Sequence, residues 1–167
     1  MAPYTDRRQR GFTLLEMMLV IVLIGLTGSL VIGRLSADRD PFARPATALM
    51  ATLQNALEQA TQQQTLYGLA LAHNGWQLMA YRREQWHQVQ HAPFTLSEQM
   101  DISLRIEQQF IPLPARLAAQ AEPQLWIYPG GETTVFTLSL QQGNCAQRTS
   151  ASGFMAFQRE EVSCDEG

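Results

Sequence analysis

The sequence contains no lysine, and its 12 basic residues are all arginines that are scattered along the chain. The net charge is −3; residues 1–11 carry +2, and subtracting this from −3 leaves −5 for the rest. Binding to nucleic acid depends on clustered lysine and arginine side chains that contact phosphates. An acidic body without a basic stripe therefore argues against nucleic acid as the main partner.

Motifs for catalysis and metal binding are also missing. The three histidines, His73, His87 and His91, have no metal-ligand spacing with a cysteine or a second carboxylate, and neither H-E-x-x-H nor C-x-x-C occurs. There is no G-x-S-x-G elbow and no glycine loop that would bind phosphate. The sequence therefore predicts no catalytic, cofactor-binding or metal-binding residue, and we do not expect an enzyme.

Cysteine is scarce: Cys145 and Cys164 are the only two, and both lie near the C-terminus. If the N-terminal segment directs the rest of the chain out of the cytoplasm, these two become candidates for a disulfide. The chain-entropy model gives such a loop about 3 kcal/mol of stabilisation. The alternative is a pair of free thiols that only fill space.

One long hydrophobic run is present, at residues 12–32, and it contains a single charged residue, Glu16. As a helix it would extend about 32 Å at 1.5 Å per residue, which matches a hydrocarbon core of about 30 Å. Arg7, Arg8 and Arg10 precede the run. By the positive-inside rule they would keep the N-terminus in the cytoplasm and place the C-terminal body outside it.

Three explanations compete for this run. A cleaved secretory signal would need a shorter apolar core and a small-residue cleavage site after it. A plain signal anchor fits the length but leaves Glu16 in lipid, where a charge costs about 2–3 kcal/mol. The third explanation is a cut between Gly11 and Phe12, because the new α-amino group of Phe12 can pair with Glu16 of a neighbouring subunit. Such a buried pair would set the register between helices in a bundle.

The basic leader, Gly11 and the sequence FTLLEMMLVIVLIG after it resemble the class III signal of type IV pilins and type II secretion pseudopilins. The resemblance implies that a membrane aspartyl peptidase cuts after Gly11 and methylates Phe12. It also implies that Glu16, the fifth residue of the mature chain, is an assembly contact.

The exported body begins with a helix followed by strands. Residues 36–45 are polar and contain two prolines, which predicts a kinked linker. Residues 46–64 carry an apolar stripe at helical spacing, so we expect a helix whose stripe lies on a sheet. We expect strands at residues 66–72, 76–81, 86–89, 102–106, 125–128, 134–140 and 153–159, and a loop at 108–123. The three tryptophans lie in these strands, where core packing is the favoured interpretation.

This order predicts an α+β fold with an antiparallel meander. We expect four parts: a cleaved leader at 1–11, a transmembrane assembly helix at 12–35, the linker at 36–45 and a periplasmic head at 46–167. The block LWIYPGGETTVFTLSL at residues 125–140 resembles the C-terminal hairpin of H-type minor pseudopilins, and residues 44–81 resemble that family's helix and hairpin.

The H-type resemblance implies a type IV pilin-like fold and a place in the tip complex of the type II secretion pseudopilus. The implied partners are other minor pseudopilins, the major pseudopilin, the prepilin peptidase and N-methyltransferase, the inner-membrane assembly platform and exported substrates. No cofactor is implied. Cys145 and Cys164 resemble instead the C-terminal disulfide loop of type IV pilins, so a minor pilin for adhesion, twitching or DNA uptake stays open. A signal-anchored periplasmic protein that is never processed is a third possibility.

Overall fold

The computed structural model describes Leu14 and residues 17–19, 40–89 and 92–165. The chain divides into two compact units, Met1–Pro41 and Phe42–Gly167, of which the second is the head. The predicted site residues Gly11, Phe12 and Glu16 lie outside the described residues. None of the helices within the described residues is long and apolar enough to cross a membrane.

The head begins with the helix α2, Ala43–Gln63. Its buried residues recur every three or four positions, as an amphipathic helix requires, and they are Pro45, Ala46, Leu49, Leu53, Ala56 and Ala60. The helix starts three residues before the expected position because Pro45 stands in its first turn, where a missing N–H costs little. It ends at Gln64, whose backbone is left-handed (φ 50°) and whose N–H donates to Ala60 O.

Strands β1 to β4 and β7 form the first sheet, in the order β3-β2-β1-β7, with β4 also paired to β2. All its pairs are antiparallel. The bounds are β1 Tyr67–Ala72, β2 Gly75–Arg82, β3 Gln85–Gln88, β4 Phe94–Thr95 and β7 Leu125–Ile127. Every residue of β1 is buried, so both faces of the sheet are covered at its centre.

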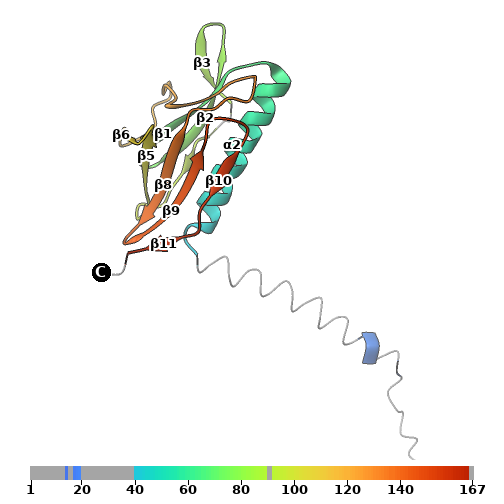
Figure 1. The fold of residues 1–167 in the computed structure, drawn as a ribbon. Helices are drawn as coiled ribbons and strands as arrows, with labels where there is room; N and C mark the ends of the chain where they lie inside the picture. Colours follow the sequence, from blue (N-terminus) through green and yellow to red (C-terminus); the bar gives the residue numbers. More distant parts are fainter. Residues whose placement is uncertain (1–13, 15–16, 20–39, 90–91, 166–167) are drawn as a thin grey trace, which may run out of the picture. The chain divides into compact units, whose positions relative to one another are not determined.

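The second sheet has the order β10-β9-β8-β5-β6, with β11 also paired to β9. Its pairs are antiparallel as well. The bounds are β5 Asp101–Ile106, β6 Gln109–Ile111, β8 Phe136–Gln142, β9 Cys145–Ala151, β10 Phe157–Arg159 and β11 Ser163–Cys164. Helix α2 contacts β1 and β7 of the first sheet and β9 and β10 of the second (Figure 1). The main core therefore lies between α2 and two sheets.

The prediction of an α+β head with a helix on antiparallel strands is confirmed, but the strands do not form one meander. The expected turn between β7 and β8 exists: Gly131 N donates to Tyr128 O, and Ile127 pairs with Thr133 as an isolated bridge. After this turn β8 joins the second sheet, whereas β7 belongs to the first. The segment expected to be a simple hairpin thus carries the chain from one sheet to the other.

Strand β9 was not predicted because its inward side chains are mostly polar. Gln147, Thr149 and Ala151 are buried in alternation, as in any strand with one covered face. Only the last of them is apolar, so the sequence lacks the alternation of apolar and polar residues that marks a strand. The short strands β4, β6 and β11 were missed too. The expected strand at 153–159 is reduced to β10.

The loop after β6 covers the free edge of β1. Gln124 N donates to Leu69 O, Gln124 Oε1 accepts from Leu71 N, and His73 N donates to Pro114 O. Close approach is possible because β1 has a glycine here: a Cβ on Gly68 would stand 2.5 Å from Pro123 Cγ. The loop thus pairs with the part of β1 that β7 does not reach, and it satisfies backbone groups that would otherwise be unpaired.

Candidate functional site

Within Met1–Pro41, the described residues of the hydrophobic run are helical and expose apolar side chains. Leu14 is 86% exposed and Met18 is 69% exposed, and residues 17 and 19 are also exposed. Apolar side chains gathered on one segment and left open are typical of surfaces that contact lipid or another protein.

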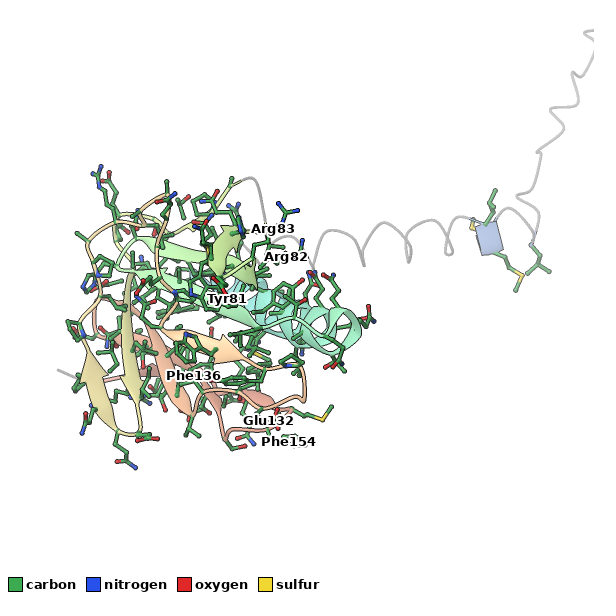
Figure 2. The ribbon with its side chains drawn as sticks, turned by 90° about the horizontal axis from the view of Figure 1, so that it is seen from above. Tyr81, Arg82, Arg83, Glu132, Phe136 and Phe154 are labelled. Carbon is green, nitrogen blue, oxygen red and sulfur yellow. A yellow bond between two sulfur atoms is a disulfide. The ribbon has the colours of Figure 1, made fainter. Side chains whose placement is uncertain are left out.

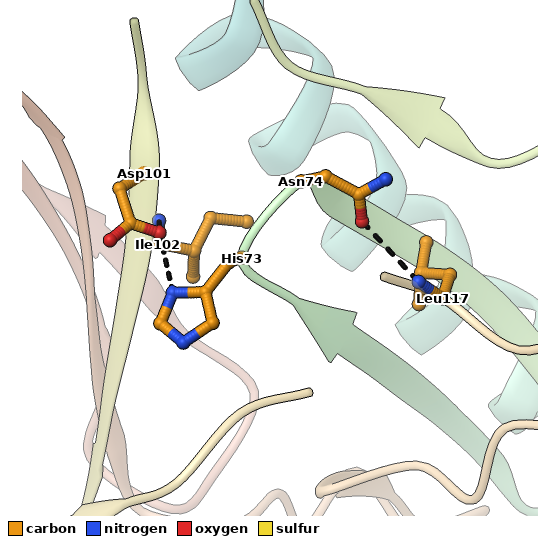
Figure 3. Close-up of polar contacts among 5 residues, drawn as sticks. All are labelled: His73, Asn74, Asp101, Ile102 and Leu117. Carbon is orange, nitrogen blue, oxygen red and sulfur yellow. Dashed lines mark hydrogen bonds and ion pairs between the residues drawn. The ribbon is translucent and has the colours of Figure 1, made fainter. Parts of the chain in front are cut away.

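In the head, the structure brings His73 and Asp101 together, a pairing that no sequence motif indicates. His73 lies in the β1–β2 turn, and its Nδ1 is 2.6 Å from Asp101 Oδ1 at the start of β5 (Figure 3). The same carboxylate oxygen accepts a hydrogen bond of 2.7 Å from Ile102 N. The two side chains are 47% and 54% exposed. The pair joins the two sheets across their surface.

Ser97 lines the same hollow as His73 and Asp101, but no hydrogen bond joins its hydroxyl to the imidazole in the described part of the chain. A nucleophile activated by a histidine needs that bond. Among the described residues there is also no group of three or more His, Cys, Asp or Glu side chains that could hold a metal ion. Hydrogen bonds around the β1–β2 turn connect it to other segments of the head. Besides the contact of His73 with Asp101, Asn74 Oδ1 accepts from Leu117 N (Figure 3).

Cys145 and Cys164 form a disulfide with an S–S distance of 2.01 Å. They stand opposite each other in the pairing of β9 with β11, so backbone hydrogen bonding and the covalent link act at the same point. Both residues of β11 are exposed. The disulfide therefore holds a strand that buries little of its own surface.

A groove beside α2 is lined on one side by the helix and on the other by residues 155–157. Its volume is about 480 Å³. Its lining residues are Gln54, Leu57, Glu58, Thr61, Gln62, Met155, Ala156 and Phe157. We call it the α2 groove. Met155 is 56% exposed, and its neighbour Phe154, which does not line the groove, is 57% exposed. The groove and its surroundings therefore present apolar side chains to solvent.

The opposite side of α2 carries a different surface, which we call the arginine turn: Tyr81, Arg82 and Arg83 at the end of β2. Figure 2 shows these three residues on one side of α2, with Glu132 and Phe154 on the other. Arg82 donates a hydrogen bond of 2.9 Å to Gln63 Oε1 at the end of α2. Tyr81 is 40% exposed and packs edge-on against Trp86 at 5.1 Å.

The tryptophans only partly follow the core-packing prediction. Trp76 is 1% exposed, stacks on Phe94 at 4.2 Å and belongs to the core, as expected. Trp126 is 44% exposed, so that part of the prediction is wrong. Strand β7 buries Leu125 and Ile127 on one face and turns the residue between them outward, where the indole N–H donates to Pro123 O.

Comparison with known proteins places the chain in a family. Residues 6–32 match the prokaryotic N-terminal methylation motif. The type II secretion system protein H of Aeromonas hydrophila is 36% identical over 152 residues, which cover 81% of this chain and 82% of that protein. The chain belongs to the type II secretion system protein H family. The fold is also that of a solved structure, the minor pseudopilin EpsH of Vibrio cholerae, with a TM-score of 0.57 and 19% identity over 72% of this chain and 97% of that one.

A shorter match reaches a second component of the same system. The type II secretion system core protein G of Aeromonas hydrophila is 43% identical over 53 residues, which are 31% of this chain and 37% of that protein. Membership of the protein H family accounts for the helix-on-sheets head. It gives the chain a structural place among pseudopilins, which is what the resemblance at residues 44–81 and 125–140 implied.

Proposed function

We propose that this chain acts as a minor pseudopilin of the pseudopilus tip, where it links the tip to the major pseudopilin for export of folded proteins across the outer membrane. The observation that carries this proposal is the likeness to type II secretion system protein H over 152 residues. A head in which α2 lies on two antiparallel sheets supports it.

Processing at the N-terminus is the first step of the proposed function. The prepilin peptidase cuts after Gly11, and its N-methyltransferase activity methylates the new amino group of Phe12. The match of residues 6–32 to the N-terminal methylation motif supports this assignment.

Glu16 then serves as an assembly contact. Its carboxylate would be costly in lipid without a partner, and the Phe12 amine of a neighbouring subunit supplies one. The pair fixes how far one helix is shifted along the next, because each charge is costly at any other height in the bundle. The exposed apolar side chains at Leu14 and residues 17–19 supply the rest of the contact with lipid or neighbouring helices.

The orientation follows from charge. Arg7, Arg8 and Arg10 hold the N-terminus in the cytoplasm, residues 12–35 cross the inner membrane, and the head at 46–167 lies in the periplasm. The last three residues of the predicted linker at 36–45 form the first turn of α2, which begins at Ala43. A disulfide between Cys145 and Cys164 is compatible with an oxidising periplasm.

The chemistry on this chain is therefore done by the peptidase, and the chain itself acts by binding. Its partners are the other minor pseudopilins, the major pseudopilin, the inner-membrane assembly platform and exported proteins that contact the head. Nucleic acid is not among them. The His73–Asp101 pair has a structural role in this account, since it joins the two sheets.

One observation favours a minor type IV pilin as a second candidate. The Cys145–Cys164 disulfide closes a loop near the C-terminus, and such a loop resembles that of type IV pilins. The identity to protein H over most of the chain favours secretion instead.

Deletion of the chain decides between these two functions. In a strain that has both systems, we expect the deletion to leave exported enzymes in the periplasm and to leave twitching and DNA uptake unchanged. Complementation with the intact chain should restore release, and complementation with the Gly11→Val variant should not. Normal release together with lost twitching would show that the chain is a pilin.

A further inference from the structure

Three exposed side chains share one face of the head beside the turn between β7 and β8. Tyr128 N donates to Glu132 O, and Glu132 pairs with Phe154 as an antiparallel bridge. Residues that stand opposite each other in antiparallel strands point to the same face, so Glu132 lies between two aromatic residues. Tyr128 is 39% exposed and Phe154 is 57% exposed. We call this surface of Tyr128, Glu132 and Phe154 the Glu132 face.

The backbone holds the Glu132 face in place. Thr133 N donates to Gly153 O, and Met155 N donates to Gly131 O. Residues 153–155 are therefore tied to the turn between β7 and β8. A surface that is already ordered loses little conformational entropy when a partner binds to it.

The chemistry of the Glu132 face suits an arginine side chain. In the described part of the chain the Glu132 carboxylate forms no ion pair. It lies over Gly130, where an added Cβ would stand 2.5 Å from Glu132 Oε2. A guanidinium group can donate two hydrogen bonds to one carboxylate and can stack on aromatic rings at the same time. A carboxylate between two exposed rings offers both kinds of contact.

The arginine turn carries a side chain of this kind. Arg83 lies between β2 and β3, at the tip of a hairpin that projects from one end of the head (Figure 1). Its side chain is exposed and has no ion pair within the described ranges. Arg82 differs, because it already donates to Gln63 Oε1. The exposed ring of Tyr81 adds an apolar group beside Arg83.

The two surfaces do not face each other within one chain, because they lie on opposite sides of α2 (Figure 2). They can face each other when two copies of the chain lie side by side. Such a contact joins two different surfaces and is therefore heterologous. It leaves one Glu132 face and one arginine turn free at the two ends of a pair.

We propose that Arg83 of one copy of this chain binds the Glu132 face of a second copy. Its guanidinium binds the Glu132 carboxylate and stacks against Tyr128 and Phe154, as the opposite charges and the exposed rings favour. This inference goes beyond the proposed function and does not depend on it, since the contact needs no other pseudopilin.

Photocrosslinking tests the contact in the full chain. Benzoylphenylalanine replaces Phe154 in a chain with one affinity tag, which is co-produced with a second full chain that carries a different tag. We expect a crosslinked product with both tags, attached within residues 81–86 of the second chain. Arg83→Glu in the second chain should lower its yield at least fivefold, because two carboxylates then face each other. The matched control Arg116→Glu makes the same change in charge at another exposed arginine and should leave the yield unchanged.

A charge swap separates a direct contact from a general defect. Glu132→Arg in the first chain should lower the yield with a wild-type second chain by a similar factor. Its combination with Arg83→Glu in the second chain should restore at least half of the yield. Circular dichroism and the melting temperature should be unchanged in every variant. The inference is overturned if no product carries both tags, if the attachment lies outside residues 81–86, if Arg83→Glu leaves the yield unchanged, or if the swap does not restore it.

Discussion

His73 Nδ1 lies 2.6 Å from Asp101 Oδ1, and this contact joins the β1–β2 turn of the first sheet to β5 of the second. Both side chains are about half exposed, so water competes for this hydrogen bond and weakens it. The carboxylate has a second task, since it also accepts from Ile102 N. Asp101 therefore contributes to stability in a second way, within β5, that His73 does not share.

Replacement of each residue should separate these two tasks. We expect His73→Ala to lower the free energy of unfolding by less than about 1 kcal/mol, because an exposed hydrogen bond competes with water and contributes little. Asp101→Ala should cost about 1 kcal/mol more, because the hydrogen bond from Ile102 N is lost as well. Asp101→Asn keeps an acceptor and should resemble His73→Ala. Urea unfolding of the purified chain in detergent measures all three, and a larger cost for His73→Ala than for Asp101→Ala would contradict the assignment.

The β2–β3 turn contains two residues of types that rarely adopt a left-handed backbone. Arg83 and Glu84 have φ values of 50° and 63°, the left-handed region that a two-residue hairpin turn of type I′ needs and that Asn-Gly usually supplies. We expect Glu84→Gly to raise the free energy of unfolding by about 0.5–1 kcal/mol, because the left-handed backbone no longer clashes with a Cβ. The control Gln85→Gly, in the strand that follows, should lower it. If Glu84→Gly destabilises the head, the turn is not strained at this residue.

The disulfide gives a prediction on stability. The replacement of Cys145 and Cys164 by serine should lower the free energy of unfolding by about 2–3 kcal/mol. The reason is that the disulfide, which links residues 19 positions apart, then no longer restricts the conformations of the unfolded chain. Chemical denaturation of the oxidised, reduced and serine forms measures the loss. Mass mapping without reductant should recover a peptide pair that contains both cysteines. Free thiols in periplasmic material would contradict the pairing.

Glu16 gives a prediction on assembly. Glu16→Ala should leave membrane insertion and cleavage intact, because neither uses the carboxylate, and should weaken co-purification with the other pseudopilins. Thr13→Ala, three residues earlier, serves as a control for a general defect in the helix. Recovery of partners at the wild-type level by Glu16→Ala would count against pairing with the Phe12 amine.

Local features of the sequence predicted much of the fold. The apolar stripe of α2 is visible as a period, and β1 and β2 are recognisable because Asn74 and Gly75 stand between two apolar segments. Strand β9 could not be seen in the same way, since it buries Gln147 and Thr149. The division into two sheets also could not, because the pairing of β7 with β1 joins residues nearly 60 positions apart.

The N-terminal motif and the α2 groove differ in how close together their residues lie in the sequence. Gly11, Phe12 and Glu16 form a motif within six residues, so a sequence alone presents them. The α2 groove combines Leu57 and Glu58 with Met155 and Phe157, about 100 residues later, and neither segment has a motif of its own. Only the packing of β10 beside α2 creates this surface.

The N-terminus of the assembled protein tests the central claim most directly. The chain is isolated from sheared or detergent-extracted pseudopili, and its N-terminal peptide is analysed by mass spectrometry. The account predicts a peptide that begins at Phe12, with its amino group methylated, and predicts that Gly11→Val leaves the leader in place and keeps the chain out of the fibre. Chains that begin at Met1 and are nevertheless incorporated would contradict the account.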